Sequence, residues 1–267
     1  MANNYKNVKR FAVMGGAYGN IPALKASIED AISEGCEILV FLGDAIGFCG
    51  HSDEILKLIR DRFDIFISGN HEQQAALGLS DCGCGYESKE DEEIGCAAFE
   101  AALSSLNQNN KKWLSILKDK EIIETSIGKI LLCHGSPERT NEFLYGSQVY
   151  DEKLQYYLEK YDLSGFVCTH TGIPWLRYLS DNKFAANCGV AGKSDNDGDP
   201  AVHYLILSLE NSFKLEIRRV AYDYKKWADK LKEIGINYIF INEILTGCWT
   251  CGIKSLPQDE KTNFQCI

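Results

Sequence analysis

The chain has 267 residues, of which 45% are hydrophobic, and it carries a formal net charge of −10 at pH 7. A chain of this length buries one sizeable core, so a single domain with a C-terminal extension is expected. The acidic charge argues against a nucleic-acid polymer as partner, because surfaces that bind phosphate backbones need clustered Lys and Arg. No apolar run approaches the roughly 20 residues that span a bilayer, and the first residues do not resemble a signal peptide. We therefore expect a soluble, cytoplasmic protein without a membrane partner.

Apolar runs and helical spacing alternate in the first part of the chain. Three short apolar runs predict buried strands, at residues 8–15, 38–42 and 64–68. Residues 21–35 show helical spacing and end at a glycine, and Ser52 and Asp53 are expected to cap the next helix. This βαβ order is typical of a largely parallel sheet, whose chemistry lies at the carboxyl ends of its strands.

The second part of the chain has a different pattern. Residues 77–119 form a polar, glycine-rich insertion with two expected helices and the character of a lid. Five short runs then predict the strands and hairpins of a second, mixed sheet, at residues 129–133, 166–169, 183–188, 202–209 and 213–220. Residues 224–235 and 237–247 predict a helical C-terminal tail.

Eleven cysteines are spread along the chain, and an odd number in a chain of this size predicts that most are reduced. Four of them lie in or beside apolar runs, where a thiol serves as a small hydrophobic side chain, namely Cys36, Cys133, Cys168 and Cys188. Cys248 and Cys251 have CxxC spacing but no second pair at zinc-finger distance, so we expect a structural, redox-sensitive role.

Polar residues follow four of the predicted strands directly. They lie in the motifs GD at 43–44, GNHE at 69–72, HGSP at 134–137 and THTG at 169–172. A divalent transition metal takes carboxylate, amide and imidazole ligands from rigid elements. Each motif offers one such ligand, in the order Asp44, Asn70, His134 and His170. Each motif alone is a weak signal, but the ordered series predicts one metal centre.

With GAYGN at residues 16–20 and GDAIGFCG at residues 43–50, these motifs resemble the calcineurin-like metallophosphoesterases of the compact prokaryotic branch. The resemblance implies an α/β fold in which two mixed β-sheets pack face to face between outer helices, as a four-layer αββα sandwich. It also implies hydrolysis of phosphomonoesters or phosphodiesters at a centre of two metals. On this basis residues 1–220 form the metallophosphoesterase domain, and residues 221–267 pack on it as a helical extension.

The sequence departs from the family at one of the two metals. Three positions that ligate the first metal in the family have other residues here, namely Gly16, Tyr18 and Gly172. All four positions of the second metal match, as Asp44, Asn70, His134 and His170. The resemblance therefore implies one divalent transition metal per chain, manganese, iron or zinc, and two only if other residues rebuild the lost site.

Cys82 and Cys84 are candidates for such rebuilding, because their loop soon follows GNHE and thiolates favour zinc or iron over magnesium. Tyr18 is another candidate, as a phenolate. In the alternative interpretation, which we favour, CGCG is a flexible loop whose glycines provide turns.

The resemblance also suggests roles for residues around the metal. His71 matches the family residue that assists the leaving oxygen, and Glu72 is expected to orient its imidazole. Asn20 and Arg139 are expected to contact the substrate, since a guanidinium matches phosphate oxygens bidentately.

Two functions stay open on this evidence. The first is a metal-dependent phosphoesterase for a small phosphorylated substrate, such as a nucleotide. The second is a catalytically degenerate relative that binds a metal, a nucleotide or a protein. Retention of His71 favours the enzyme, because a structural metal site needs no leaving-group acid, whereas the three lost ligands favour the binding module. The sequence predicts no oligomeric state.

Overall fold

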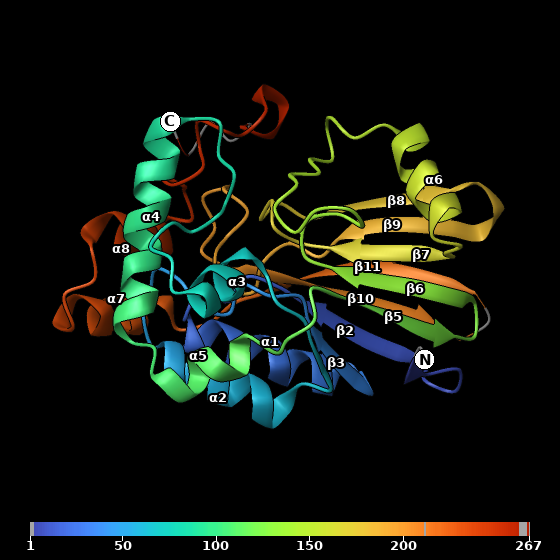
Figure 1. Ribbon diagram of the computed structural model, residues 1–267, viewed down its shortest axis with the longest axis horizontal. Helices are drawn as coiled ribbons and strands as arrows, with labels where there is room; N and C mark the ends of the chain where they lie inside the picture. The colour runs from blue at the N-terminus through green and yellow to red at the C-terminus, as the bar shows by residue number, and fades with distance from the viewer. Residues whose placement is uncertain (1–2, 211, 262–265, 267) are drawn as a thin grey trace.

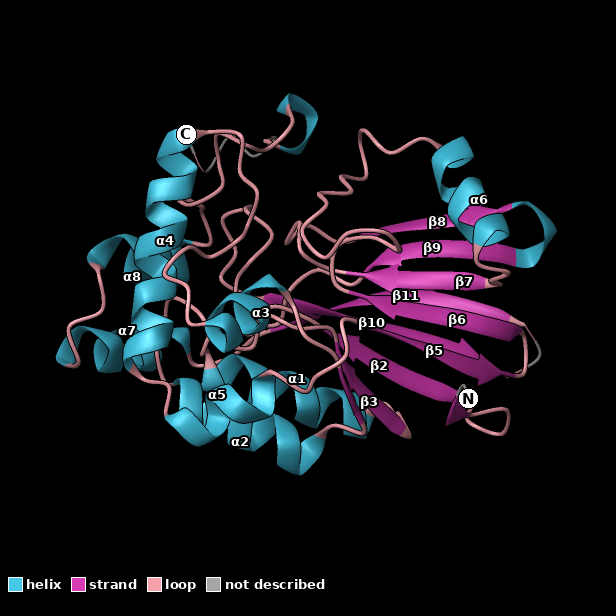
Figure 2. Ribbon diagram, viewed as in Figure 1, coloured by secondary structure: helices cyan, strands magenta, loops and turns pink. Residues whose placement is uncertain are grey.

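The computed structural model describes every residue of the chain except 1–2, 211, 262–265 and 267. Its strands, magenta in Figure 2, form two mixed sheets. The six-stranded sheet has the order β1 (Asn3–Asn4), β5 (Lys120–Thr125), β6 (Gly128–Cys133), β7 (Gly165–Cys168), β9 (Lys183–Asn187) and β8 (Trp175–Leu179). The five-stranded sheet has the order β11 (Phe213–Val220), β10 (Val202–Leu209), β2 (Arg10–Met14), β3 (Ile38–Phe41) and β4 (Ile65–Phe66).

The two sheets pack face to face, because their strands are apolar on both sides. On β2, Phe11 and Val13 lie in the core between the sheets, together with Leu132 of the other sheet. Ala12 and Met14 point the opposite way, into the core beneath the outer helices. Successive side chains of a strand point to opposite faces, so β2 is buried on both of its faces. The predicted four-layer αββα sandwich is confirmed.

Helices cover both outer faces (Figure 1). The described helices are α1 (Ile21–Ser33), α2 (Ser52–Arg62), α3 (Asn70–Leu77), α4 (Lys89–Ser104), α5 (Gln108–Leu114), α6 (Asp151–Lys160), α7 (Tyr224–Glu233) and α8 (Tyr238–Thr246). Leu24 of α1 and Ile55 of α2 pack on the five-stranded sheet, while Leu154 of α6 packs on the six-stranded one. Within the described part of the chain, no helix has the length and apolar character needed to cross a membrane.

The insertion and the C-terminal extension share a core. Ala98 of α4 packs with Trp227 of α7 and with Phe240 and Ile241 of α8. In Figure 1 these three helices stand together on the side of the molecule away from α6. Two segments that lie far apart in the sequence therefore build one body beside the sheet ends.

Two local predictions need correction. Ser52 and Asp53 do not cap α2, which follows His51 without any side-chain cap. The Ser52 hydroxyl donates to the carbonyl of Ala102, and the Asp53 carboxylate accepts from Asn107, so both residues tie α2 to the insertion instead. The strand expected at residues 64–68 is shortened to β4, because only two of its residues pair with β3.

The cysteines follow the prediction in part. Cys133, Cys168 and Cys188 are buried free thiols and Cys36 is a half-buried one, as expected of small hydrophobic side chains. The CxxC pair, however, does not act as a unit. Cys248 forms a disulfide with Cys266, whereas Cys251 is a buried free thiol.

Candidate functional site

The predicted metal ligands meet at the carboxyl ends of the strands. Asp44 follows β3, Asn70 begins α3 after β4, and His134 and His170 follow β6 and β7. Asp44 and His170 adopt left-handed backbone angles, with φ values of 59° and 66°. Such strained conformations gather at functional sites, where the surrounding structure compensates for them.

Two glycines allow the loops around Asp44 and Asn70 to approach each other. A Cβ added at Gly43 would collide with the backbone of Gly69, and one at Gly69 would collide with the Asp44 carboxylate. Gly43 also has a φ of 92°, a backbone conformation that residues with a side chain rarely adopt. The glycines of GD and GNHE are therefore required by the close packing of the ligands.

The imidazoles and the carboxylate form a tight cluster. His134 Nε2 lies 3.2 Å from Asp44 Oδ2 and 3.2 Å from His170 Nδ1. The opposite nitrogens donate to backbone carbonyls, His134 Nδ1 to Leu42 and His170 Nε2 to Cys84. Each ring therefore presents its inward nitrogen as a ligand, with the orientation fixed by the backbone.

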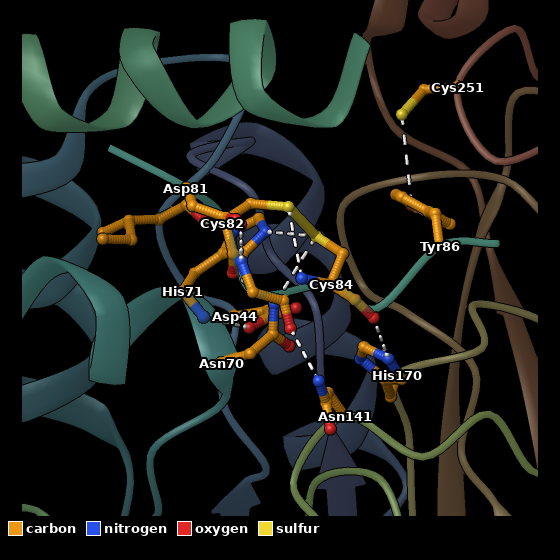
Figure 3. Close-up of a disulfide and its surroundings, with 12 residues drawn as sticks. Asp44, Asn70, His71, Asp81, Cys82, Cys84, Tyr86, Asn141, His170 and Cys251 are labelled. Carbon is orange, nitrogen blue, oxygen red and sulfur yellow. Dashed lines mark hydrogen bonds between the residues drawn. A yellow bond between two sulfur atoms is a disulfide. The ribbon is translucent and has the colours of Figure 1, made fainter. Parts of the chain in front are cut away.

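Asn70 supplies the fourth donor, next to Asp44 in Figure 3. Its Nδ2 donates to the carbonyl of Cys82 over 2.9 Å, while its buried Oδ1 has no hydrogen-bond partner among the described residues. An unpaired buried oxygen costs about 1–3 kcal/mol, so it calls for a partner such as a cation. The donor set fits a divalent transition metal.

Burial and neighbouring charges shift the pKa values in this cluster. Burial raises the pKa of Asp44, but the imidazoles of His134 and His71 outweigh it and hold that pKa below its usual value. Burial lowers the pKa of His134, but the Asp44 carboxylate raises it overall. Burial and the His134 charge lower the pKa of His170 to about 3. His170 is therefore neutral near pH 7, as a metal ligand must be.

The expected partnership between His71 and Glu72 is not present. His71 Nδ1 donates to the carbonyl of Ile46 over 2.8 Å, so the backbone orients this ring. The Glu72 carboxylate is fully buried, and among the described residues it accepts from backbone N–H groups alone, those of Asp44, Ala45, Ile46 and Gly69. Glu72 thus organises the loop that carries Asp44, which corrects its predicted role.

Other side chains occupy the positions of the missing ligands. A Cβ added at Gly16 would collide with Val190 and with the Tyr18 hydroxyl, and one at Gly172 would collide with the Trp249 indole. Burial raises the pKa of Tyr18 well above its usual value, so a metal would have to offset this shift to bind Tyr18 as a phenolate.

A cavity of about 60 Å³ lies beside the cluster, and Asp44, His71 and His170 form part of its wall. Lys193 is the single Lys or Arg among the described residues that line it, and its Nζ lies 3.0 Å from the buried Glu243 carboxylate. Aromatic side chains make up much of the remaining wall, namely Tyr18, Phe48, Tyr86, Phe143, Tyr145, Phe240 and Trp249. The cavity is therefore small and largely apolar, with the cation Lys193 in its wall.

Sequence reasoning missed Lys193. It precedes the acidic, turn-rich residues 194–200, which are typical of a surface loop. Contacts with the C-terminal extension bring it to the cavity, since it also donates to the carbonyl of Cys251 and lies over the Trp249 ring. No local pattern around Lys193 signals these contacts.

The two expected substrate contacts lie outside the cavity. Asn20 is fully buried and caps α1, and its Nδ2 donates to the Gly192 carbonyl and the Tyr222 hydroxyl. Its polar atoms are thus used inside the protein. Arg139 is exposed and lines a separate depression beside Asn70.

The CGCG loop lies over the ligand cluster, with Cys82 and Cys84 paired as a disulfide (Figure 3). Three side chains hold successive carbonyls of this loop: Asn70 holds that of Cys82, Asn141 that of Gly83 and His170 that of Cys84. The glycines provide turns as expected, with φ values of 64° at Gly83 and 77° at Gly85, and hydrogen bonds tie three consecutive residues of the loop to the protein.

Comparisons with known proteins agree with this architecture. The sequence pattern of the calcineurin-like phosphoesterases matches residues 9–191. A protein of Methanocaldococcus jannaschii described as uncharacterized is 29% identical over 238 residues, covering 82% of this chain and 90% of that protein.

Two crystal structures share the fold across nearly their whole length. A metallophosphoesterase from Sphaerobacter thermophilus has a TM-score of 0.69 at 20% identity, covering 90% of this chain and all of the other. A hypothetical protein from Pyrococcus horikoshii has a TM-score of 0.71 at 18% identity, covering 90% and 99%.

Proposed function

Because the chain belongs to the calcineurin-like phosphoesterase family, we propose that it hydrolyses a small phosphorylated substrate with one divalent transition metal. The ligands of this metal are Asp44, Asn70, His134 and His170. The observation that carries the proposal is the unpaired, buried Oδ1 of Asn70 beside Asp44, which lines the cavity. Manganese, iron and zinc all match a set of imidazole, carboxylate and amide donors.

When bound, the metal supplies a Lewis acid that polarises a phosphoryl oxygen. Lys193, in the cavity wall, has the charge to hold a second phosphoryl oxygen, at the cost of weakening its pair with Glu243. As an imidazolium, His71 would protonate the leaving oxygen from Nε2, while its Nδ1–H keeps its hydrogen bond to the Ile46 carbonyl. The apolar walls exclude water and strengthen these interactions.

One observation favours the second candidate, a module that binds without turnover. The lost ligands are not merely absent, because Trp249 packs where a side chain at Gly172 would lie, and Tyr18 and Val190 do so at Gly16. A cavity of about 60 Å³ has room for a phosphate-sized group and little more. Binding of metal and phosphate alone is compatible with this geometry.

Hydrolysis of aryl phosphomonoesters and phosphodiesters tests the proposal, with manganese, iron or zinc supplied in separate reactions. We expect weak turnover that Asp44→Ala abolishes together with metal binding. Lys193→Met should raise KM at least tenfold, whereas Lys214→Met, an exposed lysine on β11, should not change it. If fully metallated protein hydrolyses no member of a broad panel, while phosphate still raises its melting temperature, the binding module replaces the enzyme.

A further inference from the structure

A second group of metal-binding side chains adjoins the retained cluster. His71 Nε2, Cys82 Sγ and Cys84 Sγ lie within 4.8 Å of one another, and all three residues are buried. His71 Nε2 is 3.5 Å from Cys84 Sγ, while the carbonyl of Ile46 holds the opposite nitrogen. This is the arrangement of an imidazole ligand whose orientation is fixed by the backbone.

Hydrogen bonds and burial hold the loop that carries Cys82 and Cys84, and with it both sulfurs, in place. Its carbonyls are held by Asn70, Asn141 and His170, which come from three separate parts of the chain. Cys82 is 1% exposed and Cys84 is 7% exposed, and Cys84 also lines the cavity. A surface turn needs neither this burial nor these bonds.

We propose that Cys82, Cys84 and His71 form a second site, selective for a soft divalent cation such as zinc. Two thiolates and one imidazole are typical zinc ligands, and a set of three leaves a coordination position facing the cavity. The retained cluster has carboxylate and amide oxygens instead, so the two sites differ in the metals that they prefer. Asn70 adjoins the second site, since its Nδ2 lies 3.5 Å from Cys84 Sγ, and its unpaired Oδ1 is the proposed ligand of the retained cluster.

Formation of this site requires reduction, because Cys82 and Cys84 are paired as a disulfide. A dithiol reductant supplies two electrons and two protons, which cleave the S–S bond to two thiols as the dithiol becomes a disulfide. Binding of zinc then releases the two thiol protons. The oxidised chain therefore lacks this site.

A consequence follows for catalysis, and this step rests on the proposed function. His71 cannot protonate a leaving oxygen while its Nε2 ligates zinc. Occupation of the second site should therefore inhibit phosphoester hydrolysis in reduced protein. The site itself does not depend on this consequence.

Cobalt binding tests the site directly, because a thiolate ligand to Co²⁺ gives an intense near-ultraviolet charge-transfer band. Reduced wild-type protein, freed of reductant under anaerobic conditions, should show this band and bind two equivalents of metal. Oxidised protein should bind one equivalent without the band. Absence of the band in reduced wild-type protein overturns the proposal, and this measurement needs no variant.

Variants assign the ligands. The band should disappear in Cys82→Ser/Cys84→Ser and weaken in His71→Ala, and it should persist in His134→Ala, which loses only the retained metal. Cys36→Ser is the matched control, because this thiol lies outside both clusters. Cys96 can join Cys82 and Asp81 in a different triad, so a band that needs Cys96 but not His71 contradicts the assignment.

The inhibitory consequence has a separate test. Zinc added to reduced, manganese-loaded wild-type protein should lower turnover at least tenfold, and it should have no such effect on whatever activity Cys82→Ser/Cys84→Ser retains. An inactive wild-type protein that still shows the cobalt band contradicts the proposed function and leaves the site standing. An active wild-type protein without the cobalt band contradicts the second site and leaves the proposed function standing.

Discussion

Glu72 is a buried carboxyl group that backbone donors surround. Its carboxylate accepts from Asp44 and Gly69 over 2.7 Å and 2.8 Å and from Ala45 over 2.9 Å. Burial and the Asp44 carboxylate raise the pKa of Glu72, whereas these N–H groups favour its ionised form. The residue thereby fixes the turn that presents Asp44 to the metal.

We predict that Glu72→Gln weakens metal binding although Glu72 is not a ligand. The amide keeps the shape but loses the charge, and its NH₂ group meets backbone N–H donors. Hydrogen bonds to a charged group contribute about 1.5–3 kcal/mol, so a loss of about 2–3 kcal/mol in the free energy of unfolding is expected. Urea unfolding and metal titration measure the two effects. Glu159→Gln, on the exposed side of α6, should change neither, and an unaltered metal affinity in Glu72→Gln would refute this role.

At the scale of elements, α4 and the end of the chain close the cavity together. The Asp91 carboxylate, 1% exposed, accepts from the backbone N–H groups of Gly252 and Ser255 and from the Ser255 hydroxyl. This turn carries Cys251 and Leu256 to the cavity wall. The Asp91 side chain of the insertion therefore fixes the turn of the C-terminal extension that forms part of the cavity wall.

Asp91→Ala should release this turn. The backbone N–H groups of Gly252 and Ser255 and the Ser255 hydroxyl would lose their acceptor, so the backbone around the exposed Lys254 would open locally and fit a protease more readily. We expect trypsin to cleave after Lys254 at least tenfold faster than in the wild type, with little change in far-ultraviolet circular dichroism. Glu93→Ala, on the exposed face of the same helix, is the control. Equal cleavage rates in all three proteins would show that Asp91 does not hold this turn in place.

Over the whole molecule, the sequence predicted those features that a local residue pattern determines. The bounds of β10 and β11 match the predicted runs, because β10 is a nearly continuous apolar run buried on both faces and β11 alternates apolar with charged residues. Asp44 and two histidines came together because the carboxyl ends of β3 in one sheet and of β6 and β7 in the other adjoin each other. Lys193 at the cavity and Asp91 at the C-terminal turn were missed, since their partners lie 50 and 164 residues away. Such contacts arise only from tertiary packing.

A buried histidine links acid stability to the packing of the five-stranded sheet. His203 on β10 is 3% exposed, its Nε2 accepts from Arg219, and its Nδ1 has no hydrogen-bond partner among the described residues. Burial and the Arg219 charge lower the pKa of His203 to about 4. The unfolded chain, with a histidine pKa of about 6.5, therefore binds this proton first as the pH falls.

We predict that the contribution of His203 to stability is fully present above pH 6.5 and is lost as the pH falls to about 4. The shift corresponds to at most about 3 kcal/mol, and the neighbouring Asp195 offsets part of it, because burial and Asp197 raise its pKa to about 6.

In His203→Gln, Oε1 can still accept from Arg219, but the side chain at position 203 no longer titrates. Urea unfolding from pH 7 to pH 4.5 should therefore show a flatter decline in the variant. The difference between the two curves cancels the titration of the metal ligands, which both proteins share. Parallel curves would mean that His203 is protonated in the folded protein as readily as in the unfolded chain.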